Sequence, residues 1–141
     1  MPDLKVLLIT ANPSLADAAG RAFGSAFIPC ATVNSPAKVQ VGDKRNYCLV
    51  LLDLDCLGIS KMFELKSFLS RMIGLPVIAM CNMSKTSNRE TVDILATGVN
   101  DLMPNAIDMN LLIAKTRAHL RRLGIGGSAT DRAAKNLNSS S

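Results

Sequence analysis

The sequence predicts an α/β domain in which a five-stranded, mostly parallel sheet carries helices on both faces. Two observations predict this fold class. Short apolar runs of strand length alternate with segments of helical character over residues 4–122, and parallel neighbours need such crossover segments. The strongest of the runs, residues 47–54, is almost continuously apolar, as are strands that are buried on both faces of a parallel sheet.

The predicted strands are rich in branched aliphatic residues. They span residues 4–10, 27–33, 47–54, 76–81 and 101–103. Four helices are predicted between and after them, because apolar residues recur there near helical spacing. These helices span residues 15–23, 60–73, 88–96 and 108–120.

Local signals support several helix boundaries. Pro13 stands just ahead of the first helix, Gly74 follows the second, and Ser87 with Glu90 has the spacing of a capping box. Between the second and third strands, Ser35 and Pro36 resemble a helix start. The segment after them, residues 37–46, is polar and contains a glycine, so we expect its helix to be short or irregular.

Composition excludes several classes of protein. Hydrophobic residues make up 48% of the chain and aromatic residues only 4%, which predicts an aliphatic core. No apolar run approaches the ~20 residues of a membrane span, and the N-terminus lacks the pattern of a signal peptide. We therefore expect a cytoplasmic protein that does not contact a membrane.

The net charge of +5 is spread along the chain, and its one cluster stands near the end of the last predicted helix. The helix dipole favours cations there. Aromatic residues are too few for a stacking surface, so direct nucleic-acid binding is not expected. The four cysteines, Cys30, Cys48, Cys56 and Cys81, show no C-x-x-C spacing, which favours free thiols over disulfides or a zinc site.

Ligands of open parallel sheets bind outside the carboxyl ends of the strands. Here those ends are residues 10–12, 53–56, 81–84 and 104–106. They contain no glycine-rich phosphate loop. The single histidine, His119, lies in the last predicted helix and pairs with no nucleophile in the sequence, so we identify no catalytic residues and expect no enzyme.

Three segments together resemble the receiver domain of two-component response regulators. They are residues 6–13, residues 49–54, and the stretch from Gly98 to Pro104 with the helix that ends at Arg122. The resemblance implies a flavodoxin-like (βα)5 three-layer sandwich with strand order 2-1-3-4-5, formed by residues 1–122. Residues 123–141 have the composition of a flexible tail or linker, and an effector domain could follow in a longer chain.

The resemblance also places Asp53 at the phospho-accepting position of receivers. It places Thr10 and Ala11 where receivers carry two acids that help hold Mg²⁺, Cys81 at a hydroxyl position, and Asn105 at the position of a lysine. Mg²⁺ prefers hard oxygen ligands, so we expect it to bind weakly or not at all, and no other metal site is expected. Losing one electrostatic contact to the transferred group typically lowers the rate of phosphoryl transfer ~10²–10³-fold. Because several such contacts are lost, we expect phosphorylation to be negligible.

One further carboxylate, Asp55, could still assist Asp53 in residual chemistry. The leading hypothesis is therefore a degenerate receiver-like signalling module that binds a protein partner or dimerises, independently of phosphorylation. The resemblance assigns the interaction to the surface formed by residues 88–120. Its candidate residues are Ile94, Leu95, Val99, Leu102, Lys115, Arg117 and Arg122.

Two alternatives stay open. The first is a genuine phosphorelay regulator that a histidine kinase phosphorylates at Asp53. The second is a redox or metal sensor that uses Cys56 and Cys81, whose strand ends could meet.

Overall fold

Five parallel strands form one sheet in the order β2-β1-β3-β4-β5, which confirms the predicted topology. The computed structural model describes residues 4–124. The strands are β1 (Lys5–Ile9), β2 (Cys30–Val33), β3 (Tyr47–Asp53), β4 (Val77–Cys81) and β5 (Asp101–Pro104).

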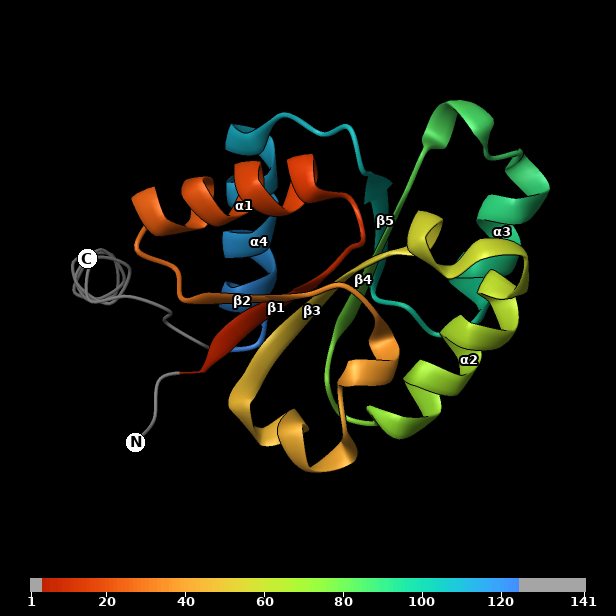
Figure 1. The fold of residues 1–141 in the computed structure, drawn as a ribbon, viewed down its shortest axis with the longest axis horizontal. Helices are drawn as coiled ribbons and strands as arrows, with labels where there is room; N and C mark the ends of the chain where they lie inside the picture. The colour runs from red at the N-terminus through yellow and green to blue at the C-terminus, as the bar shows by residue number, and fades with distance from the viewer. Residues whose placement is uncertain (1–3, 125–141) are drawn as a thin grey trace.

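Helices cover both faces of the sheet, so the described residues form a three-layer sandwich (Figure 1). The helices are α1 (Pro13–Ser25), α2 (Lys61–Arg71), α3 (Asn88–Ala96) and α4 (Met109–Arg122). Successive strand residues point to opposite faces. Val6 and Leu8 therefore pack in the apolar cluster under α1 and α4, whereas Leu7 and Ile9 pack in the cluster under α2 and α3.

Side-chain caps fix where three of the helices begin. Asn12 accepts hydrogen bonds from the first backbone amides of α1, and Asp108 does the same for α4. Ser87 Oγ accepts from the Glu90 amide at 3.1 Å, as the capping-box spacing predicted. Each cap stands just before its helix, so it marks where the loop after the preceding strand ends.

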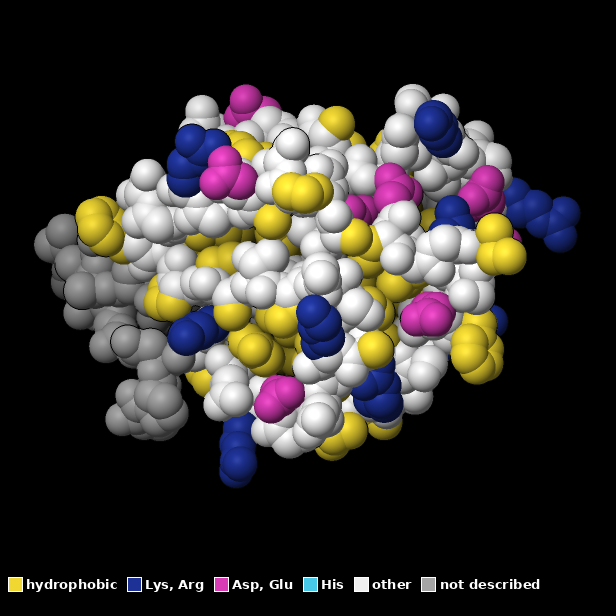
Figure 2. Space-filling view, viewed as in Figure 1, with side chains coloured by type: hydrophobic (Ala, Val, Ile, Leu, Met, Phe, Trp, Pro, Cys, Tyr) yellow, Lys and Arg dark blue, Asp and Glu magenta, His cyan; other side chains and the backbone are white. Residues whose placement is uncertain are grey.

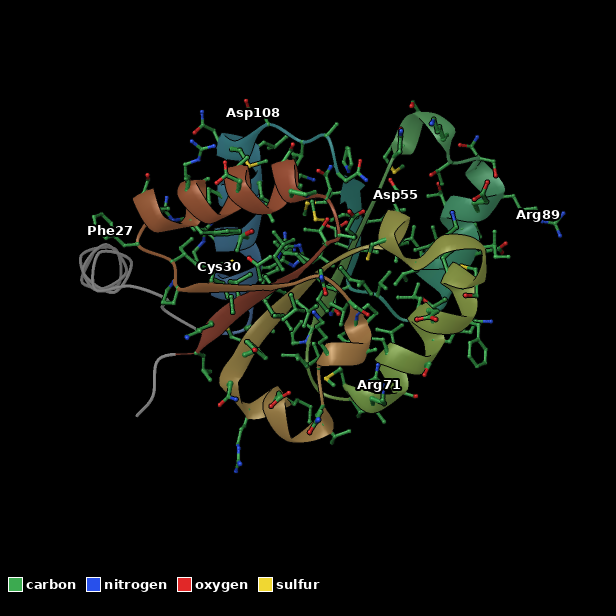
Figure 3. The ribbon with its side chains drawn as sticks, in the orientation of Figure 1. Phe27, Cys30, Asp55, Arg71, Arg89 and Asp108 are labelled. Carbon is green, nitrogen blue, oxygen red and sulfur yellow. The ribbon has the colours of Figure 1, made fainter. Side chains whose placement is uncertain are left out.

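The connection between β2 and β3 contains no α-helix but two 3₁₀ segments, η1 (Pro36–Lys38) and η2 (Val41–Asn46). This agrees with the expected short or irregular helix. Arg71, at the end of α2, holds the connection in place (Figure 3). Its guanidinium donates to the carbonyl oxygens of Val39 at 2.8 Å and Pro36 at 3.4 Å, and it lies 5.6 Å from the centre of the Phe68 ring.

The second strand begins later than predicted, at Cys30 instead of Phe27. Phe27 has a positive φ of 59° and is 76% exposed, so it belongs to the turn that follows α1. The tail expected over residues 123–141 lies, beyond Gly124, outside the described residues. Within residues 4–124, no helix is both long enough and apolar enough to cross a membrane.

Candidate functional site

Asp53 lies at the carboxyl end of β3, in the middle of the sheet. Only 3% of its surface is exposed. Thr10, which directly follows the neighbouring strand β1, is 2% exposed. Neighbouring parallel strands bring their carboxyl ends to one edge of the sheet, so these two polar side chains meet within an apolar surrounding.

Both carboxylate oxygens of Asp53 accept hydrogen bonds from neutral donors. Thr10 Oγ1 donates to Oδ2 at 2.7 Å. The Asp55 backbone amide donates to Oδ1 at 3.2 Å, and Asn105 Nδ2 donates to the same oxygen at 3.2 Å. A buried carboxylate costs much less free energy when it is hydrogen-bonded in this way. The site is therefore satisfied by the protein's own groups.

Asn105 joins two carboxylates. Its Nδ2 donates to Asp55 Oδ2 at 2.5 Å as well as to Asp53. Its backbone amide donates to the carbonyl oxygen of Cys81 at 2.9 Å, which holds the residue beside the end of β4. An amide in this place supplies hydrogen bonds but no positive charge.

The acidic side chains joined at this edge are Asp53 and Asp55. Mg²⁺ requires octahedral oxygen coordination and is usually held by carboxylates. Thr10 and Ala11 provide no carboxylate, and the Asp53 oxygens are already hydrogen-bonded. Within residues 4–124, no cluster of three or more His, Cys, Asp or Glu side chains could hold a metal ion.

The remaining residues of the predicted pocket, Ala11 and Cys81, make no hydrogen bond to the Asp53 carboxylate. Ala11 is exposed and, together with Thr10, lines a surface cavity between the ends of β1 and β2. Cys81 is fully buried in the cluster under α2 and α3. Its Sγ contacts Met83 Sδ at 3.3 Å and accepts from Thr86 Oγ1 at 3.5 Å. Cys81 therefore does not take part in the hydrogen bonds of Asp53.

Cys56 is the other cysteine near this edge. Its Sγ donates to the carbonyl oxygen of Asp53 at 2.9 Å. Burial raises the pKa of the Cys56 thiol, and the negative charge of Asp53 raises it further. Because the thiolate is the reactive form of a cysteine, this environment suppresses its reactivity.

The predicted interaction surface needs correction at three residues. Ile94 is completely buried and Val99 is 8% exposed, since both pack under α3 in the core. Arg117 lies on the opposite side of α4, where its guanidinium donates to the carbonyl oxygen of Ala26 at 3.1 Å. The side chains of these three residues therefore do not contribute to the exposed surface of α3 and β5.

Leu95, Leu102, Lys115 and Arg122 keep at least part of their surface accessible. They come from α3, β5 and α4. Exposed Leu111 lies one turn before Lys115 on α4 and extends the same surface. We call these five residues the α3-β5-α4 surface.

Two lysines near the site were missed by the sequence analysis. Lys61 and Lys85 line a cavity of about 360 Å³ beside Asp55. The strand end predicted after β4, residues 81–84, lies one residue before Lys85. A signal was available, because lysines that follow strand ends are candidates for anion binding.

In sequence comparisons, no family model and no curated protein matches the chain. Solved structures do match it. A two-component response regulator from Clostridium difficile shares 18% identity with a TM-score of 0.70, and the match covers 85% of this chain and 98% of that one. The chain has the receiver-domain fold.

Two further structures share the receiver fold with this chain. The BeF₃-activated N-terminal receiver domain of RstA from Klebsiella pneumoniae is 19% identical, with a TM-score of 0.70, and the match covers 83% of this chain and 98% of that one. An orphan response regulator of Helicobacter pylori is 18% identical, with a TM-score of 0.69 over 84% of this chain and 98% of that one.

Proposed function

We propose that this chain is a receiver-fold signalling module whose output does not depend on phosphorylation of Asp53. One observation carries the proposal: the Asp53 carboxylate is 3% exposed and accepts hydrogen bonds from Thr10, Asn105 and the Asp55 amide. A phosphoryl donor would have to displace these groups before it could reach an oxygen of Asp53.

Charge supports the same conclusion. Phosphoryl transfer relies on cations that neutralise the oxygens of the moving group. The three groups that contact Asp53 are neutral, and the nearest additional charge in this network is a second carboxylate, Asp55. The arrangement thus favours a stable buried carboxylate over a phosphate acceptor, and this argues against the phosphorelay alternative.

The proposed output is contact with another protein through the α3-β5-α4 surface. Leu95 is 47% exposed and Leu111 is 49% exposed, and Leu111 lies one helical turn from the cation Lys115. Exposed apolar residues bordered by charges are typical of protein interfaces. We propose self-association as the simplest case, because one such surface can pair with its own copy. An effector domain after Ser141 stays a prediction.

Phosphorylation can be tested directly by intact-mass spectrometry. The protein is incubated with Mg²⁺ and acetyl phosphate, beside a receiver domain known to accept phosphate. We expect phosphate mass on the control protein and none on this chain. A phosphate adduct that disappears in the Asp53→Asn variant would contradict the proposal.

Self-association can be tested by sedimentation velocity over a range of protein concentrations. We expect a dimer that Leu95→Asp weakens and that Asp53→Asn leaves unchanged. Val41→Asp is the matched control, because Val41 is 54% exposed on η2, away from the α3-β5-α4 surface. A monomer at every concentration would contradict self-association.

A further inference from the structure

A surface cavity lies beside the Asp53 site, at the carboxyl ends of β3 and β4. The cavity has a volume of about 360 Å³, within the range of about 300–1,000 Å³ that is usual for small-molecule sites. Its walls come from η3 (Leu54–Ser60), the start of α2, and η4 (Met83–Lys85). They include Asp55, Gly58, Lys61, Asn82, Lys85 and Thr86.

Two cations from different elements line this cavity. Lys61 opens α2, and its Nζ lies 3.3 Å from Glu90 Oε2, an ion pair that holds the lysine between α2 and α3. Lys85 ends η4, is exposed, and forms no ion pair within residues 4–124. Figure 2 shows Lys and Arg side chains beside Asp and Glu side chains over this part of the molecule. Lys85 is therefore a cation without an ion-pair partner among the described residues.

The lining of the cavity also includes a hydrogen-bond acceptor, the carboxylate of Asp55. Asp55 is exposed, and Figure 3 labels it beyond the end of β3. Its Oδ2 is engaged by Asn105, whereas Oδ1 accepts no hydrogen bond within residues 4–124. A ligand with an anionic group near the lysines could place a hydroxyl or ammonium group here.

Backbone geometry keeps the cavity open at Gly58. This residue has φ 68° and ψ −151°, a conformation that is essentially restricted to glycine. No atom lies within 4 Å of the place where its Cβ would stand. The backbone of η3 is thus accessible from the cavity without a side chain in front of it.

We propose that this cavity binds a small ligand non-covalently through an anionic group, phosphate or carboxylate, which Lys85 and Lys61 contact. Asp55 accepts a hydrogen bond from a hydroxyl or ammonium group of the same ligand. The inference goes beyond the proposed function, because it concerns ligand binding and is independent of self-association.

Amide chemical shifts measured by NMR provide the test. The ¹⁵N-labelled protein is titrated with sodium phosphate in one arm and with sodium lactate, a hydroxy-carboxylate, in the other. Sodium chloride keeps the ionic strength constant in both arms. We expect saturable shifts at Gly58, Asn82 and Lys85 in at least one arm, and the arm that saturates identifies the preferred anionic group.

Charge removal tests the assignment to Lys85. Lys85→Gln should weaken the binding about tenfold, as expected for the loss of a charge-assisted hydrogen bond. Lys66→Gln is the matched control, because Lys66 is also an exposed lysine but does not line the cavity. Equal melting temperatures of the two variants will show that both are folded. No saturable shift in either arm, or unchanged binding by Lys85→Gln, would overturn the proposal.

Discussion

The side chains of Thr10 and Asp53 are joined by a hydrogen bond of 2.7 Å between Oγ1 and Oδ2. Thr10 follows β1 and Asp53 ends β3, so the bond ties two neighbouring strands together at their carboxyl ends. In the receiver domains that this sequence resembles, an acidic residue stands at the position of Thr10. A hydroxyl donor in that place attracts the buried carboxylate, where a second acid would repel it.

Replacing Thr10 with valine removes this donor while keeping the shape of the side chain. We expect Thr10→Val to lower the free energy of unfolding by about 1–3 kcal/mol, because a buried charged acceptor loses a hydrogen bond. Urea denaturation measures the effect. Thr32→Val makes the same change at an exposed threonine of β2 and should cost little. Equal stabilities of the two variants would contradict the structural role given to Thr10.

Returning acids to the end of β1 should create a metal site. In the double variant Thr10→Asp/Ala11→Asp, three carboxylates meet at this edge, and their repulsion should lower the melting temperature. Mg²⁺ binds the folded state only, so it should raise the melting temperature of the variant by several degrees. The wild-type protein should show no such rise. A rise of similar size in the wild type would mean that its residues do hold Mg²⁺.

Arg71 should be important for stability although it lies far from the candidate site. Arg71→Ala leaves the carbonyl oxygens of Val39 and Pro36 without their donor and removes the contact with Phe68. We expect a loss of about 1–3 kcal/mol in the free energy of unfolding, measured with urea. The control is Arg89→Ala, because Arg89 is an exposed arginine of α3. This variant should change the free energy of unfolding by less than about 0.5 kcal/mol. The interpretation fails if both variants unfold alike.

Stability should fall at alkaline pH through Cys30. Burial raises the pKa of its thiol from 9.0 to about 11, while Thr32 lowers it slightly. The folded state thus keeps the proton that the unfolded state loses, and the stabilisation present below pH 9 disappears as the pH rises to about 11. Comparing urea denaturation of wild type and Cys30→Ala across this range isolates a contribution of at most about 3 kcal/mol, because the shift is about two pKa units. Parallel pH profiles would disprove it.

Much of the fold could be predicted because its signals are local. A continuous apolar strand such as β3 and a cap such as Ser87 depend on neighbours within a few residues. The position of Asp53 at a strand end follows from the same pattern. Phe27 shows the limit of this reasoning, since its β propensity suggested a strand, whereas the turn after α1 required a positive φ there.

The contacts of the candidate site could be predicted only in part. Asn105 lies 52 positions from Asp53 in the sequence, and nothing local shows that its amide reaches both Asp53 and Asp55. The resemblance to receivers likewise placed Ile94 on an interaction surface, although the packing of α3 on the sheet turns its side chain into the core.

The order of apolar and polar residues along the chain was enough to specify five strands, their flanking helices and the edge of the sheet at which polar groups gather. This is so because burying apolar surface depends on residue type and spacing. Tertiary packing alone decided that neutral donors surround Asp53, that Arg71 binds the carbonyl oxygens of Pro36 and Val39, and that Lys85 lines a cavity. Such relationships depend on how separate elements approach one another, and a hydrogen bond tolerates an error of only a few tenths of an ångström.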